Sequence, residues 1–241
     1  MNNLGYTLRS NKLAQVGELA VVFAVPGAAP LLALPLAGEN PLARQAVVWV
    51  ANVVMLALVW AGLRMRGQGW AHLGLARQGG GARALWRGFL KTLAVFLAAV
   101  VAFVVGSIVM ANIVGKPEGA DMSGYDYLRG NLPLLLAALP AVWFVSSLGE
   151  EIVYRGFLIT RLAEMGAGTR AAWRWAVGVS ALAFGAAHFQ WGLIGVVQTA
   201  CMGLALGISY RVLKRNLWIL VVAHAYMDTI LFVQMYLPAR P

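Results

Sequence analysis

Between Gly149 and Gly156 the chain reads Gly-Glu-Glu-Ile-Val-Tyr-Arg-Gly, inside an apolar run that extends from about Leu132 to Ile159. One ionisable side chain in a membrane segment costs on the order of 2.5–3.5 kcal/mol on insertion scales. Two carboxylates and a guanidinium so close together therefore require a reason. We interpret this stretch as the centre of an active site that lies within the membrane.

The composition indicates an integral membrane protein. Of the 241 residues 61% are hydrophobic and 12% are charged, and the mean hydropathy is +0.73. A soluble domain is about 45–50% apolar and about 25% charged. The single cysteine, Cys201, lies in an apolar segment, so neither a disulfide framework nor a cysteine-based zinc site is expected.

The positive net charge is explained by the membrane topology of the chain. The chain has 19 Lys and Arg against 9 Asp and Glu, a net charge of +10 that in a soluble protein would suggest a nucleic-acid partner. These basic residues gather in alternate loops, as they do in membrane proteins that obey the positive-inside rule. The expected partners are therefore the lipid bilayer and a substrate within it, and no nucleic acid.

We predict one all-α domain over residues 1–241, a polytopic membrane bundle of about seven transmembrane helices, with a range of six to eight. The apolar segments lie at about 16–37, 45–63, 89–114, 132–160, 175–189, 192–210 and 217–237. Pro26, Pro30 and Pro35 are expected to break the first segment, and the fifth is short. The motifs described below fall in a catalytic core at about 132–237.

Loop charges predict the orientation. The loop after the second segment carries Arg64, Arg66, Arg77, Arg83 and Arg87, which indicates the cytoplasmic side. The following loop has Glu118, Asp121 and Asp126 against Lys116 and Arg129, which indicates the external side. The N-terminus is therefore predicted to be cytoplasmic. The content of Ala, Gly and Arg and the compact loops suggest a bacterial plasma membrane protein.

Three acidic side chains and two histidines lie inside the predicted spans: Glu150, Glu151 and Asp228, and His188 and His224. Any one of them alone is more often a polar group that joins two helices through a hydrogen bond. Depth can be counted at 1.5 Å per residue from the basic residue at the cytoplasmic end of each helix, which is Arg161, Arg174 or Arg215. Glu150, His188 and His224 then lie at depths of roughly 16, 21 and 14 Å. Three helices therefore direct polar groups to one layer near the middle of the membrane.

Spacing within each helix suggests how these groups divide their roles. Glu151 and Arg155 are i,i+4 and are expected to form an ion pair. Glu150 lies about 100° around an α-helix from Glu151, so it is the carboxylate left free for acid–base chemistry. Phe184 and His188 are also i,i+4. Phe184 is expected to pack in the core and can also shape the pocket.

His224 and Asp228 share a helix face, so Asp228 can fix the imidazole tautomer or both can point at one ligand. Two mechanisms fit. In one, Glu150 and His188 activate a water while His224 and Asp228 support the oxyanion, with no cofactor. In the other, His188, His224 and either Asp228 or Glu150 bind Zn²⁺. The sequence leaves both open because they use the same residues.

Together the elements Glu150-Glu151-xxx-Arg155, Phe184-xxx-His188 and His224-xxx-Asp228 resemble the motifs of the CPBP family of intramembrane proteases. That family includes the CAAX prenyl endopeptidases and bacterial relatives tied to bacteriocin processing and immunity. The resemblance covers roughly 132–231. Each motif alone is weak, but their order on successive membrane helices makes the match specific.

The resemblance implies an all-helical membrane protease whose cavity opens towards the cytoplasm or the bilayer. By position in the motifs it implies that Glu150 and His188 activate water and that His224 and Asp228 stabilise the oxyanion. Glu151 and Arg155 would be mainly structural.

In one respect the chain departs from the family pattern, because the third motif often ends in Asn. An ionised Asp cannot donate to an oxyanion. Asp228 would then be protonated, orient His224 or ligate a metal.

The predicted function is hydrolysis of a peptide bond in a membrane-associated or leader-type peptide, or in a segment of a membrane protein. A non-catalytic scaffold or immunity protein of the same fold is the alternative, and its mark would be a missing catalytic residue. None of the motif residues is missing. Intramembrane charges also occur in proton-coupled transporters, but no internal repeat supports that function.

Overall fold

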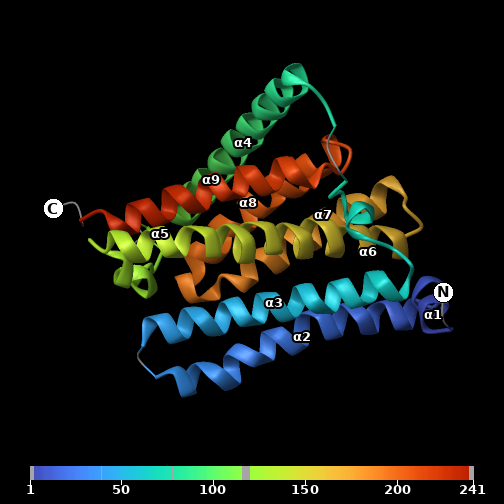
Figure 1. The fold of residues 1–241 in the computed structure, drawn as a ribbon, viewed down its shortest axis with the longest axis horizontal. Coiled ribbons are helices and arrows are strands. Elements are labelled where there is room, and N and C mark those ends of the chain that lie inside the picture. Colours follow the sequence, from blue (N-terminus) through green and yellow to red (C-terminus); the bar gives the residue numbers. More distant parts are fainter. Residues whose placement is uncertain (1–2, 39, 77–78, 116–119, 239–241) are drawn as a thin grey trace.

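The computed structural model describes residues 3–38, 40–76, 79–115 and 120–238, and no strand occurs among them. Most of the long helices run side by side along one direction (Figure 1). In chain order the elements are α1 (Asn3–Ser10), α2 (Lys12–Ala37), α3 (Pro41–Met65), η1 (Trp70–Leu73), α4 (Ala82–Val114), η2 (Ser123–Leu128), α5 (Leu132–Ala141), η3 (Val142–Leu148), η4 (Glu151–Leu158), α6 (Ile159–Met165), α7 (Arg170–Ala187), η5 (Phe189–Trp191), α8 (Gly192–Val212) and α9 (Leu217–Tyr236). Arg77, Lys116 and Glu118, used above to predict topology, lie outside the described residues.

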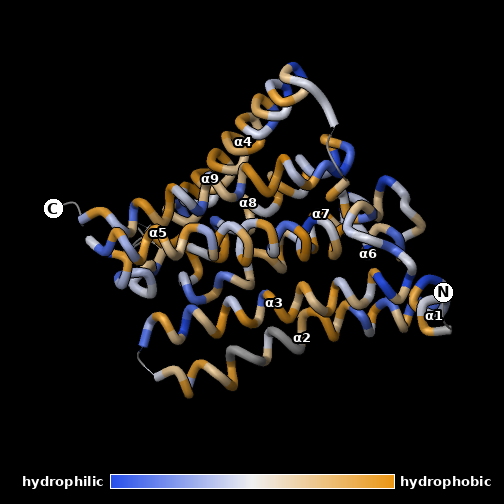
Figure 2. Tube along the Cα trace, in the orientation of Figure 1, coloured by the Kyte–Doolittle hydropathy of each residue, from blue (hydrophilic) through white to orange (hydrophobic). Residues whose placement is uncertain are grey.

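The prediction of an all-α membrane bundle is confirmed. Each predicted span corresponds to a helical segment, and the fourth is the continuous run α5, η3, η4 and α6. Among the residues that the structure describes, five segments are long and apolar enough to cross a membrane: Pro41–Met65, Ala82–Val114, Leu132–Met165, Phe189–Val212 and Leu217–Tyr236. Helices α2 and α7 occupy the first and fifth predicted spans. Apolar residues dominate the middle of the long helices (Figure 2).

Helix α2 corrects one expectation, because it is continuous from Lys12 to Ala37 despite its three prolines. A proline removes one backbone donor and strains the preceding turn. Membrane helices tolerate this loss because neighbouring groups satisfy the freed carbonyls. Helices α2 and α3 pack as an antiparallel pair along one side of the molecule (Figure 1).

The helix that carries Glu150 does not keep α-helical geometry. Pro140 lies inside α5, and the two following segments, η3 and η4, are π-helical. The amide of Ile159 accordingly bonds the carbonyl of Tyr154, five residues back. Such turns are rare and occur frequently at functional sites. The angular steps expected for an α-helix therefore do not hold around Glu150 and Glu151.

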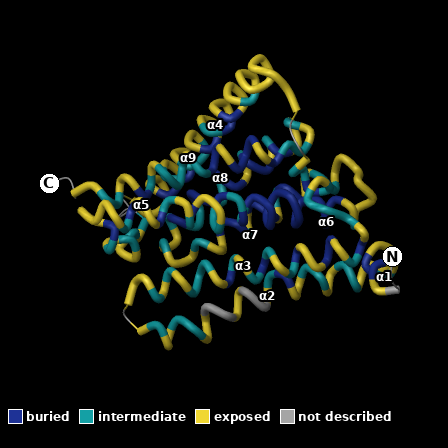
Figure 3. The backbone as a smooth tube through the Cα atoms, viewed as in Figure 1, coloured by how far each residue is buried: buried dark blue, intermediate teal, exposed yellow. Residues whose placement is uncertain are grey.

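The larger of two buried apolar clusters among the described residues joins α3, η4, α7, α8 and α9 and lies in the middle of the molecule (Figure 3). Helix α8 packs against both α4 and α7. Helix α4 leans away from the bundle, and its first turns expose Leu85, Trp86 and Phe89. The polar residues of the three motifs lie on the elements that this cluster holds together.

Candidate active site

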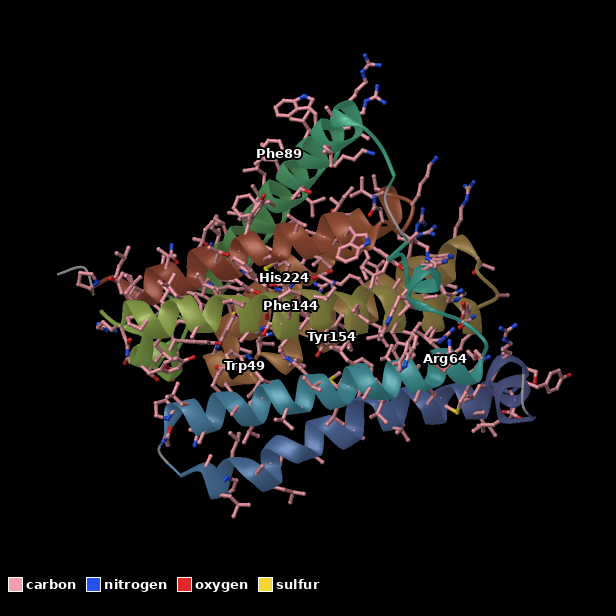
Figure 4. The ribbon with its side chains drawn as sticks, viewed as in Figure 1. Trp49, Arg64, Phe89, Phe144, Tyr154 and His224 are labelled. Atoms are coloured by element: carbon pink, nitrogen blue, oxygen red, sulfur yellow. The ribbon has the colours of Figure 1, made fainter. Side chains whose placement is uncertain are left out.

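His224 lies between two carboxylates of the neighbouring helix. Its Nδ1 is 2.9 Å from Oε1 of Glu151, and its Nε2 is 3.9 Å from Oε2 of Glu150. Nε2 is also 3.7 Å from Oδ1 of Asp228, one turn along α9. Figure 4 shows His224 in the middle of the bundle, near the helix formed by η3 and η4. The structure thus places Glu150 and His224 close together, as their similar predicted depths in the membrane suggested.

Glu151 and Arg155 form the predicted ion pair, with 3.0 Å between Oε1 and Nη1, and both side chains are fully buried. The guanidinium of Arg155 also lies over the ring of Phe184, with 4.1 Å from Cζ to the ring centroid. Glu151 does more than the sequence predicted, because the same Oε1 contacts His224. One carboxylate therefore compensates a buried cation and orients an imidazole.

Asp228 is held by a residue that the sequence analysis did not single out. Its Oδ2 accepts a hydrogen bond of 2.6 Å from Oγ of Ser147, a fully buried residue of η3. One expected role of Asp228 was to fix the tautomer of His224. In the structure Glu151 contacts Nδ1 of that ring instead. The physical reason is that α9 packs against η3 and η4, which brings Ser147 and Glu151 to adjacent turns of α9.

His188 ends α7, and its ring has a defined tautomer. Nδ1 lies 2.8 Å from the carbonyl oxygen of Phe184. A carbonyl only accepts, so Nδ1 carries the hydrogen and Nε2 of the neutral ring keeps its lone pair. The ring packs between Phe184 and Trp191, at 4.7 Å from each ring centroid. Phe184 is fully buried and thus both fills the core and supports the histidine.

A cavity of about 700 Å³ includes Glu150 and His188 in its wall. Its other lining residues come from α3, η2, η3, η4, the end of α7 and η5. On α3 it is lined by Gln45, Val48 and Asn52, which share one helix face. Asn52 could have been found from the sequence, since it is an amide inside an apolar span. The cavity has the size and mixed polarity of a substrate site.

Tyr125 of η2 also lines this cavity, and no sequence pattern singles it out because it lies in a loop. Its ring packs edge-on against Trp191 and Phe232. Burial raises the pKa of Tyr125 well above its ordinary value, and the carboxylates of Asp228 and Glu150 raise it further. The hydroxyl is therefore a neutral hydrogen-bond donor at physiological pH.

The zinc alternative needs three or more ligands that converge. Among the described residues no group of three or more His, Cys, Asp and Glu is arranged to hold a metal ion. Glu151 takes Nδ1 of His224, and Ser147 holds one oxygen of Asp228. His188, His224 and either Asp228 or Glu150 are therefore not grouped as a ligand set among the described residues in this arrangement.

Comparison with known proteins agrees with the three motifs. Residues 132–230 match the family model described as type II CAAX prenyl endopeptidase Rce1-like. The chain has no significant match among curated proteins or among solved structures. The matched region contains every motif residue from Glu150 to Asp228. Residues 132–230 are therefore similar to the Rce1-like type II CAAX prenyl endopeptidases, in agreement with the CPBP resemblance.

Proposed function

We propose that the protein is an intramembrane endopeptidase that hydrolyses a peptide bond in a membrane-associated or leader-type peptide, or in a membrane-protein segment. The family match supports peptidase activity of the CAAX-protease type. One observation carries the proposal: Glu150 faces Nε2 of His224, while His188 presents a free Nε2 in the wall of the cavity that Glu150 also lines.

In this mechanism Glu150 accepts one proton of a water molecule that attacks the peptide carbonyl, while Nε2 of His188 accepts a hydrogen bond from the same water and helps to activate it. The negative charge then forms on the carbonyl oxygen. The imidazolium form of His224 donates through Nδ1 to Glu151, and its Nε2 lies beside Glu150 at the cavity wall, where it stabilises this oxyanion. Asp228, held by Ser147, fixes the position of that Nε2. When the tetrahedral intermediate collapses, the proton returns to the leaving amine.

The orientation of the proposed enzyme follows the positive-inside rule. We place the N-terminus in the cytoplasm, because Arg64 and Arg66 end α3 and Arg170 and Arg174 begin α7. We also propose that the protein lies in the bacterial plasma membrane with its C-terminus on the external side.

Substitution of the water-activating pair tests the activity. Glu150→Gln and His188→Ala should abolish cleavage, because neither amide nor methyl group can accept the proton of water. His72→Ala is the matched control, since His72 is half-buried at the opposite end of the molecule and bonds Glu164. The readout is the set of new peptide termini, identified by mass spectrometry, in membranes of cells that express each variant.

Wild-type cleavage patterns in both Glu150→Gln and His188→Ala would overturn the proposal.

A chelator added to the purified protein separates the two mechanisms. Because the described acids and histidines do not converge as a ligand set, we expect chelation to leave cleavage unchanged and metal analysis to find no stoichiometric zinc. Loss of activity with recovery on zinc addition would support the metal mechanism.

A further inference from the structure

The cavity reaches the surface at one end of the bundle. Its lining residues include exposed side chains at the start of α3, in the segment around η2 and in η5. We call the exposed lining residues Arg44, Asp121, Ser123 and Gln190 the mouth. Helix α3 begins at the mouth and α7 ends there, so Glu150 and His188 are reached from this end.

The opposite end is closed by packed side chains. Every residue from 151 to 160 is buried. Element η1 lies across this helix, because a Cβ on Gly156 would come within 3.1 Å of the Cβ of Leu73. The hydroxyl of Tyr210 and the amide of Leu217 bond the carbonyls of Leu73 and Gly74 at 2.9 and 3.1 Å. We call this the sealed end.

Basic residues concentrate at the sealed end. Among the described residues, those that flank its helix ends are Arg9, Lys12, Arg64, Arg66, Arg161, Arg170, Arg174, Arg211, Lys214 and Arg215. Figure 4 shows Arg64 at that end of α3 and Trp49 towards the other. At the mouth end the described Arg44 and Arg129 are balanced by Asp121 and Asp126. The positive-inside rule therefore assigns the sealed end to the cytoplasm.

We infer that the active cavity opens on the external face of the membrane, so that the enzyme acts on peptide segments already translocated across it. The substrate class is then an exported leader-type peptide or the external flank of a membrane protein. A translocation step must supply it. This assignment of substrate rests on the proposed function, and it differs from the cytoplasmic or lateral opening that the family resemblance implies.

The location of the mouth can be measured without any catalytic activity. In a Cys201→Ser background, which removes the single cysteine, Ser123→Cys and Gln190→Cys place a thiol at the mouth. Ser10→Cys and Ala171→Cys place one at the sealed end, and all four positions are exposed. Ser10→Cys is the matched control for Ser123→Cys, and none of the four substitutions changes the charge.

Intact cells that express each variant are treated with a membrane-impermeant maleimide, before and after permeabilisation. We expect the two mouth thiols to reach full labelling in intact cells and the two sealed-end thiols to be labelled only after permeabilisation. Mouth thiols that need permeabilisation would overturn the inference. So would equal labelling of all four positions in intact cells, or mouth thiols that stay unlabelled after permeabilisation.

The four cysteine variants keep Glu150 and His188, so labelling and cleavage measured on the same cells separate this inference from the proposed function. An external mouth together with no cleavage would contradict the peptidase proposal alone. If the chain is a peptidase, modification of Ser123→Cys by the impermeant reagent on intact cells should also block cleavage. Cleavage that continues at the wild-type rate after complete modification would contradict entry of substrate through the mouth.

Discussion

At the residue scale, the charges of the first motif have unequal tasks. Glu150 is partly exposed to the cavity, whereas Glu151 and Arg155 are fully buried. Arg155 reaches no part of the cavity wall and acts through Glu151 and the ring of Phe184. A buried carboxylate that loses its cation becomes an uncompensated charge. In the proposed mechanism the same stretch therefore supplies both a reacting group and the support of the histidine beside it.

Arg155→Ala should lower the amount of folded protein, because breaking a buried ion pair from one side costs about 3–5 kcal/mol. Glu150→Gln should leave folding nearly unchanged while it removes cleavage, since Glu150 lies at the cavity and keeps its shape as Gln. Thermal unfolding in detergent compares the two. An equal loss of folded protein in both variants would contradict this division of tasks.

Ser147→Ala should lower kcat and leave KM nearly unchanged, because Asp228 loses the donor that fixes it beside His224. A hydrogen bond to a charged group contributes about 1.5–3 kcal/mol, so the expected loss is roughly tenfold to a hundredfold. Ser180→Ala is the control, since its buried hydroxyl bonds the carbonyl of Tyr154 at 2.8 Å. That variant should lose stability and keep kcat in the folded fraction. Equal effects on kcat would contradict a positioning role for Ser147.

At the element scale, close helix packing places α7 and α8 around the site. Glycines make this possible: a Cβ on Gly106 would lie 2.9 Å from the Cα of Gln198, and one on Gly185 would lie 2.6 Å from the carbonyl oxygen of Val196. Small residues let membrane helices approach at backbone distance. Helix α8 is thereby fixed between α4 and α7, and α7 carries His188.

Gly106→Leu should destabilise the bundle by about 1–3 kcal/mol, because the side chain must push α4 away from α8. Gly88→Leu on the same helix is the control, since no described atom beyond its own helical turns lies within 4 Å of its added Cβ. The unfolding temperature of the two purified variants is compared with that of the wild type. A similar decrease of the unfolding temperature in both variants would show that the close contact between α4 and α8 is not the cause of the destabilisation.

At the scale of the whole molecule, the two ends of the bundle are built differently. The mouth end leaves a cavity, and the sealed end holds a buried polar cluster of Glu18, Arg66 and Arg161. Arg66 forms an ion pair with Glu18, and Nη2 of Arg66 donates a hydrogen bond of 3.0 Å to the carbonyl oxygen of Leu8. Nε of Arg161 is 3.8 Å from Oε2 of Glu18. This cluster ties α1, α2, α3 and α6 together at the sealed end.

Glu18→Ala should therefore lower the unfolding temperature by removing the anion between two buried guanidinium groups. Cleavage by the remaining folded protein should be unchanged, because the cluster lies at the end opposite the mouth. The unfolding temperature and the rate per folded molecule are measured together. Loss of rate without loss of stability would place the cluster in the catalytic machinery instead.

The motifs could be recognised in the sequence because the features that reveal them lie within single helical segments. The cost of a charge in an apolar segment, the i,i+4 spacing of Glu151 and Arg155 and the depth of each group below a helix end need no knowledge of the partner helix. These features predicted the all-α membrane class, the ion pair and the meeting of Glu150 with His224.

The pairing of Glu151 with His224 and of Ser147 with Asp228 was decided only by tertiary structure. Each pair joins helices that are far apart in the chain, and the π-helical turns change which side chains of the first motif face α9. The direction in which the cavity opens also depends on packing, since Leu73 must lie across Gly156 to close one end. Charge cost and helix spacing act within one segment, whereas these contacts exist only when several segments are packed together.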